Sequence, residues 1–284
     1  MTPTPHHTSA HQALTDLAHQ PEDQWDLARA SLWLAKWAEP NLNIDVYDRH
    51  LISLVHDVRA YVANDTDDPY LIIEAAQQIL ARRYGYVGVT DPAERADGAN
   101  MARTIDRRRG HAQTLAILYH LVIADFNQHV EIIDFQPRTL VAVQTRSERL
   151  LLDPVDGGRL LSARDLRQLL DRHAISDEPF NPMALTTMTP KSVLLSLQHL
   201  IKAHHLRYVA PEAALQAIEG ALLFAPTEAK LWRELGLLHA RLDHLLDATQ
   251  ALEHYLQLPS DDTHRYTASQ MLQDLHRELE RTKS

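Results

Sequence analysis

Three consecutive arginines in this chain could take part in binding chemistry. Arg107, Arg108 and Arg109 precede Gly110, and an apolar segment with helical character follows from His111. The unpaired N–H groups of a helix start attract anions, and guanidinium charges strengthen that attraction. The pattern allows two interpretations: an anion site formed by Arg107, Arg108, Arg109 and Gly110, or charged side chains that are only solvated.

Histidines are a second group of residues that could take part in chemistry, because the 284-residue chain contains 18 of them. His204 and His205 are adjacent, so they face different sides of a helix. Three other pairs each fall short of the three ligands that a metal site needs: His7/His11, His50/His56 and His239/His244. We therefore expect surface or partly buried histidines, no metal site and no cofactor.

Strand-like runs follow the arginine segment. A helix is predicted over residues 111–127, and three short apolar or β-branched runs come next, at 130–135, 139–143 and 150–152. With no helix between them, these strands should pair antiparallel. Ser162 and Asp165 then have the spacing of a capping box, which predicts a helix to about residue 173.

Helical patterns precede the arginine segment. Proline positions and apolar spacing predict helices over 21–38, 45–64 and 70–83. A loop is expected between Gly85 and Asn100, and residues 1–20 are predicted to be a flexible tail.

A helix, strands and an Asp-Pro-x-x-Gly-Gly turn at 153–158 together resemble the transglutaminase-like core. In that family a cysteine at the helix start, a histidine on the next strand and an aspartate on the strand after it form a thiol triad. The resemblance places Ala112, Arg138 and Asp153 at these positions, so only the third matches. A methyl group cannot attack a carbonyl, and a guanidinium stays protonated near neutral pH. The resemblance thus implies a transglutaminase-like fold that lacks the thiol triad.

Arg138 and Asp153 are expected on neighbouring strands. One hypothesis is an ion pair that ties these strands together in place of the histidine–aspartate pair. The alternative is that Arg138 is solvated and Asp153 only caps the Asp-Pro turn by bonding nearby backbone amides.

The carboxy-terminal third repeats with a period of about 34 residues, which is the tetratricopeptide period. Ala214 aligns with Ala248, and Trp232 to Gly236 match the W-x2-L-G start of that motif. Helical repeats of this kind expose a groove for protein partners. We predict that Lys230, Arg233, Leu237 and His199 face this groove and that it receives an acidic or extended peptide; the alternative is that these side chains pack on the core or lie in solvent.

Composition excludes several classes of protein. The first 100 residues carry 15 acidic against 7 basic side chains, which argues against nucleic-acid binding. No secretory signal and no apolar run of membrane-spanning length are evident. The absence of cysteine excludes disulfides and thiolate catalysis and fits a soluble, cytoplasmic protein.

The Arg-Arg-Gly segment, the L-x-D-P-x-x-G-G segment and the repeats together resemble the bacterial SirB-type regulator family. Members commonly have Pro-Gly-His-Phe-Leu where this chain has residues 136–140 as Gln-Pro-Arg-Thr-Leu. The resemblance implies fold more than activity.

These observations predict an α+β protein in which a helical amino-terminal section packs on a transglutaminase-like antiparallel sheet core, followed by an all-α tetratricopeptide-like domain. The expected boundaries are a core domain over 21–175, a linker over 176–190 and repeats over 191–284. The predicted function is that of a non-catalytic scaffold or regulator, a pseudoenzyme that binds a protein through its repeats. The alternative is a hydrolase or acyltransferase with a non-cysteine nucleophile.

Overall fold

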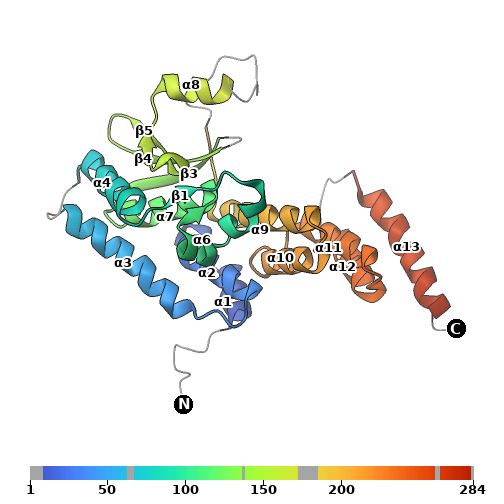
Figure 1. Ribbon diagram of the computed structural model, residues 1–284. Helices are drawn as coiled ribbons and strands as arrows, with labels where there is room; N and C mark the ends of the chain where they lie inside the picture. Colours follow the sequence, from blue (N-terminus) through green and yellow to red (C-terminus); the bar gives the residue numbers. More distant parts are fainter. Residues whose placement is uncertain (1–8, 63–66, 136–137, 172–184, 260–262, 283–284) are drawn as a thin grey trace. The chain divides into compact units, whose positions relative to one another are not determined.

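The computed structural model divides into two compact units. The central unit spans residues 21–197, and the repeat unit combines residues 1–20 with 198–284. The structure describes residues 9–62, 67–135, 138–171, 185–259 and 263–282 (Figure 1).

An antiparallel sheet with the strand order β6-β5-β4-β3-β7 forms the centre of the central unit. Its strands are β3 His129–Phe135, β4 Arg138–Gln144, β5 Arg149–Asp153, β6 Arg159–Leu160 and β7 Thr186–Thr187. Val141 on β4 lies opposite Ile132 on β3 and Leu152 on β5. Four successive residues of β4, from Leu140 to Val143, are fully buried, so both faces of this strand are covered. The three predicted strands and their antiparallel pairing are confirmed.

Helix α7, Ala112–Ala124, packs against β3 and β4 (Figure 1). Its sequence is apolar on nearly every side, which is the pattern of a helix enclosed by protein. Further α-helices of this unit are α2 Leu27–Ala38, α3 Ile44–Val62, α4 Pro69–Ala76, α5 Arg95–Ala99, α6 Met101–Arg107 and α8 Ala163–Asp171, and a π-helix over Gln77–Arg83 continues α4.

The predicted capping box is confirmed at the start of α8. The Asp165 N–H donates to Ser162 Oγ at 3.2 Å, and the Ser162 N–H donates to Asp165 Oδ2 at 2.8 Å. Each residue thus satisfies a backbone donor that the helix start leaves unpaired.

Two local predictions need correction. The chain from Pro21 does not form one helix, because a 3-10 turn at Glu22–Gln24 comes before α2. The expected loop between residues 85 and 100 holds β1, Val87–Gly88, which pairs in parallel with β2, Arg109–Gly110, and also contains α5. Short elements of this kind depend on contacts that are distant in sequence, so local patterns do not reveal them.

The repeat unit is helical. Its helices are α1 Ala10–Leu17, α10 Pro211–Phe224, α11 Ala229–Arg241, α12 Leu245–Gln257 and α13 Arg265–Thr282, and α9 Pro190–Arg207 enters it at residue 198. Gly236 of the W-x2-L-G motif lets α11 and α12 approach, because a Cβ there would lie 2.7 Å from Leu252. None of the helices in the described part of the chain is long and apolar enough to cross a membrane.

Residues 1–20 are not a flexible tail throughout. Residues 10–17 form α1, whose Leu14 is fully buried and which packs on α10. Most of the expected linker lies outside the described residues, but its end contributes β7 to the sheet. The division between the units falls after Leu197 rather than near residue 190.

Candidate functional site

Neighbouring side chains lie close to the backbone just before the start of α7. A Cβ on Gly110 would lie 2.8 Å from the Thr104 side chain and 2.9 Å from that of Leu115, so only glycine fits there. Ala112, two residues later, is the first residue of the helix and is 7% exposed. The position that the triad resemblance assigns to a nucleophile therefore carries a nearly buried methyl group.

The nearby hydroxyl of Thr114 is already used as a donor. It donates to the carbonyl oxygen of Gly98 at 2.8 Å, as does the backbone N–H of His111 at 2.7 Å. The Thr104 hydroxyl donates to the same oxygen at 3.1 Å. These bonds fix α5 and α6 against the start of α7, and Thr114 is fully buried.

Arg138 and Asp153 form the ion pair that was predicted across neighbouring strands. Arg138 Nη1 donates to Asp153 Oδ2 at 2.5 Å, while Asp153 Oδ1 accepts from the Val155 N–H at 3.0 Å. The Asp153 residue is 2% exposed, whereas the Arg138 side chain is 30% exposed. The ion pair and the turn cap, considered as alternatives, thus occur together, because the two carboxylate oxygens take different donors.

A cavity of about 340 Å³ lies beside this pair. Its lining is polar and consists of Arg138, Asp153, Val155, Asp156, Arg159, Asp165, Gln168 and Leu169. None of these described lining residues comes from α7, so Ala112 does not share this space. Arg159 donates to Asp156 at 2.7 Å and to Asp165 at 3.2 Å. Bonds from Ser162 and then from Arg159 lower the pKa of Asp165 to about 2.

The arginine run is divided among separate partners. Arg107 pairs with Asp97, and Arg109 pairs with Glu94 at 3.0 Å. Arg108, at φ 56°, ends α6 in the left-handed conformation and projects toward other residues. Because two of the three guanidinium groups are neutralised by carboxylates, the structure does not gather Arg107, Arg108, Arg109 and Gly110 into one anion site.

Arg108 lies in an aromatic cluster that the sequence did not reveal. Its Nη1 is 2.6 Å from His50 Nε2 and 2.5 Å from Tyr86 Oη, and its guanidinium lies 5.5 Å from the centre of the Tyr84 ring. Burial and the Arg108 charge lower the pKa of His50 to about 4, and burial raises the pKa of Tyr86 to about 12. The hydroxyl–imidazole contact here, 2.8 Å long, thus has a guanidinium beside it instead of the carboxylate of a catalytic triad.

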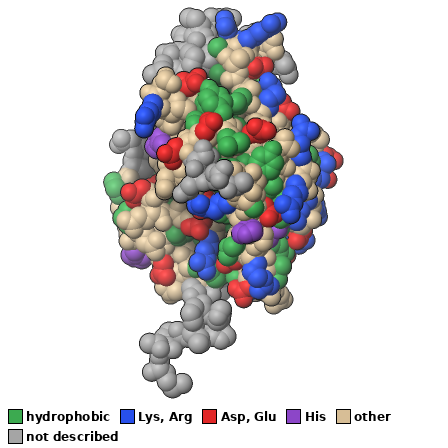
Figure 2. Space-filling view, turned by 90° about the vertical axis from the view of Figure 1, so that its left-hand side faces the viewer, with side chains coloured by type: hydrophobic (Ala, Val, Ile, Leu, Met, Phe, Trp, Pro, Cys, Tyr) green, Lys and Arg blue, Asp and Glu red, His purple; other side chains and the backbone are tan. Residues whose placement is uncertain are grey.

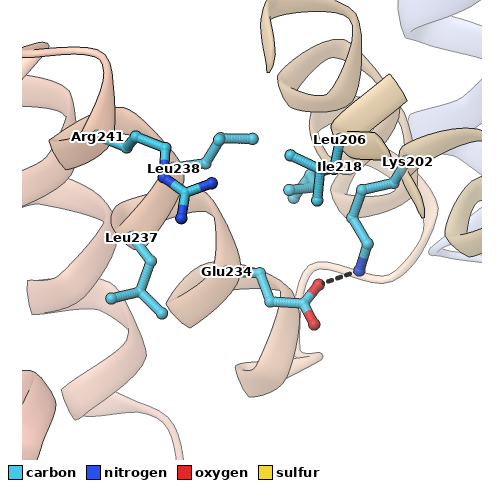
Figure 3. A pocket seen from close by; sticks show the side chains of 7 residues that line it. All are labelled: Lys202, Leu206, Ile218, Glu234, Leu237, Leu238 and Arg241. Atoms are coloured by element: carbon cyan, nitrogen blue, oxygen red, sulfur yellow. Dashed lines mark hydrogen bonds and ion pairs between the residues drawn. The ribbon is translucent and has the colours of Figure 1, made fainter. Parts of the chain in front are cut away.

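The repeat unit contains a groove of about 370 Å³, here called the repeat groove (Figure 3). Its lining consists of Lys202, Leu206, Ile218, Glu234, Leu237, Leu238 and Arg241. Of the four residues predicted from the repeat register, Leu237 lines the groove, whereas Lys230, Arg233 and His199 are not part of its lining. The register placed residues on the correct helix, α11, but could not give the helix rotation that decides which of them face the groove.

The charged side chains of the repeat groove differ in their burial and pairing. Lys202 is 8% exposed and donates to Glu234 Oε2 at 2.5 Å, as Figure 3 shows. Arg241 is exposed, and no ion pair joins it to any residue that the structure describes. Leu237 and Leu206 are 43% and 40% exposed. The groove therefore offers apolar surface next to a guanidinium.

Charges of both signs are mixed on the face of the molecule that Figure 2 presents. Figure 2 shows Lys and Arg side chains interspersed with Asp and Glu over the face it presents, with hydrophobic side chains between them. A nucleic-acid-binding surface typically has a continuous basic stripe, which this face does not show.

Comparison with known families supports both units. The family model described as transglutaminase-like superfamily matches residues 45–199, and a tetratricopeptide repeat model matches residues 201–273. The chain is also similar to UPF0162 proteins of Xylella fastidiosa. That of strain Temecula1 is 24% identical over 246 residues, covering 86% of this chain and 87% of the relative. That of strain 9a5c is 24% identical over 245 residues, covering 85% and 87%.

Among solved structures, a crystal structure of menin that reveals the binding site for Mixed Lineage Leukemia (MLL) protein aligns with a TM-score of 0.40 and 12% identity. The alignment covers 88% of this chain and 70% of that chain. The comparisons establish a transglutaminase-like unit followed by tetratricopeptide repeats, and the narrower SirB-type assignment stays a prediction.

Proposed function

The chain belongs to the transglutaminase-like superfamily, and we propose that it is a non-catalytic member whose repeats bind a protein partner as a scaffold or regulator. The observation that carries the proposal is a contrast between the two units. The Asp153 carboxylate is already bonded by Arg138 and by the Val155 N–H, whereas the repeat groove has the exposed side chains of Leu237 and Arg241. Of the groups that acyl transfer by a thiol requires, only Asp153 is present, and it is held by Arg138.

The core supports a structural role for the former triad. Asp153 is buried and has a donor on each carboxylate oxygen, so it is not free to orient an imidazole. Ala112 supplies no nucleophile. The lining of the cavity beside Asp153 contains no residue of α7 among those described.

The side chains of the repeat groove favour a partner that combines an apolar group with a carboxylate. Ile218 and Leu238 are buried at its base, and Leu237 is exposed at its side. Arg241 adds a guanidinium suited to bidentate bonding with a carboxylate. We therefore assign to the groove an extended peptide that presents an apolar side chain next to a carboxylate, in the mode in which helical repeats bind peptides.

Selection from a random peptide library on the immobilised full chain tests this assignment. The enriched peptides should combine an apolar residue with an acidic residue or a free carboxy terminus. In fluorescence anisotropy, Arg241→Glu should weaken their binding by about tenfold, roughly 1.4 kcal/mol, because it replaces attraction with repulsion.

Lys230→Glu is the matched control, since Lys230 is also an exposed cation on α11 but does not line the groove. It should change the affinity less than about twofold, in line with the small effect of a charge outside the contact. Equal weakening by both variants would mean that only general charge matters and would remove the groove as the binding element.

A further inference from the structure

A cluster of two histidines and an aspartate lies at the turn between α11 and α12. His239 Nδ1 is 3.3 Å from His244 Nδ1. One ligand atom of each of His239, His244 and Asp247 lies within 4.8 Å of those of the other two. The sequence had given no third ligand for the His239/His244 pair, whereas the structure brings Asp247 next to it.

The backbone of the turn explains why the two imidazoles meet. The His244 N–H donates to the carbonyl of His239 at 3.0 Å, and the Asp243 N–H donates to that of Ala240 at 3.3 Å. Asp243 has φ 61°, so these bonds form a Schellman motif with Asp243 as its left-handed residue. This motif brings the side chains of its first and last residues into contact, usually as an apolar pair. Here both positions hold histidine.

The third group belongs to the first turn of α12. Asp247 follows His244 by three residues, a spacing that places both on one face of the helix. A carboxylate is also stabilised near a helix amino terminus by the unpaired N–H groups and the macrodipole. Asp247 is exposed, so its side chain is free to rotate toward the two imidazoles.

The spacing of the nitrogen atoms matches that of metal ligands. Zinc–nitrogen bonds of about 2.0–2.1 Å in a tetrahedral site place two nitrogens roughly 3.3–3.4 Å apart. The observed 3.3 Å is longer than the roughly 2.7–3.2 Å of an ordinary N–H hydrogen bond. The two imidazoles therefore already have the separation that a bound Zn²⁺ requires.

We propose that His239, His244 and Asp247 bind a divalent transition-metal ion of the Zn²⁺ type, with water in the remaining position, and that the ion fastens α11 to α12. Neutral imidazole and carboxylate are ligands that Zn²⁺ accepts. Neutral imidazole is the form that coordinates a metal.

Titration of the EDTA-treated full chain tests the site. Isothermal calorimetry with Zn²⁺ should show one tight equivalent, and Co²⁺ in its place should give the visible absorption of a tetrahedral ion. His244→Gln should abolish that equivalent. Because His244 is exposed, this substitution leaves helix packing intact, and His239→Gln should have the same effect. Asp247→Asn should weaken binding by about tenfold or more, since it removes a charged ligand.

His276→Gln is the control for the other histidines. His276 Nε2 lies 3.3 Å from Glu253, so it too places an imidazole beside a carboxylate, but without a second histidine among the grouped ligands. This variant should retain the tight equivalent. Absence of a stoichiometric equivalent, or an equivalent that survives His244→Gln, would overturn the proposal and leave a simple contact between imidazoles.

Discussion

Asp153 of the central unit and Arg241 of the repeat groove lie in opposite surroundings, because the first is buried and paired and the second is exposed. In the central unit, Asp153 takes one donor on each oxygen, and Arg107 and Arg109 each have a carboxylate partner. In the repeat unit, Arg241 lies exposed beside apolar surface. The first arrangement stabilises a fold, and the second is suited to binding.

Burial accounts for this difference. A buried carboxylate is costly unless it is paired, so the buried Asp153 needs a cation beside it. Arg138 provides one. Surface charges next to a groove carry no comparable penalty, because water solvates them until a partner arrives. Differences in burial therefore separate residues that hold the structure from residues available for recognition.

The largest expected effect follows from removing Asp153. Asp153→Ala should lower the free energy of unfolding by about 3 kcal/mol, since it breaks a largely buried ion pair and removes the cap at Val155. Urea denaturation of the full chain measures this change. Arg159→Ala, at an exposed pair with Asp156, is the control and should cost less than about 1 kcal/mol. A similar loss in both variants would show that burial does not distinguish the two pairs.

A smaller effect is expected from His50 and depends on pH. Its pKa in the folded protein is about 4, against an ordinary value of 6.5. Between these values the unfolded chain binds more protons than the folded chain, so the free energy of unfolding falls as the pH drops from 6.5 to 4. His50→Gln should remove about 1 kcal/mol of that fall, a figure discounted because the ring is only half-buried.

Denaturation curves recorded from pH 7 to pH 4 check the contribution of His50. Arg108→Gln should shift the lower limit of the pH window upward, because the guanidinium is one of the two causes of the lowered pKa. If His50→Gln leaves the pH dependence unchanged, the Arg108 cluster does not hold His50 in its neutral form.

Much of the fold followed from local patterns in the sequence. The strands, the capping box at Ser162 and the Trp232 to Gly236 motif depend on periodicity and on short-range bonding, and the structure contains each of them. The pair of Arg138 and Asp153 was also accessible, because adjacent antiparallel strands bring such positions together.

Features that depend on helix rotation or on distant contacts were not predictable in the same way. The repeat period identified α11 but not which of its side chains face the groove, so Arg241 was missed and Lys230 was chosen. The Arg108 cluster joins α3 to the end of α6, 58 residues apart. The His239 and His244 contact arises from a left-handed residue at Asp243, and a spacing of five residues does not signal it.

The smallest effect is expected from a double variant that supplies the missing histidine and cysteine of the triad pattern. Arg138→His would place an imidazole beside Asp153, and Ala112→Cys would introduce the only thiol of a chain that has none. We expect no hydrolysis of ester or amide substrates above the buffer rate, because Ala112 is nearly buried and does not line the cavity beside Asp153. Labelling with an alkylating reagent reports the accessibility of the single thiol independently of turnover. Hydrolysis by this double variant that disappears on adding Asp153→Asn would show that the three positions still meet, and the contrast between the two units would then rest on side-chain identity alone.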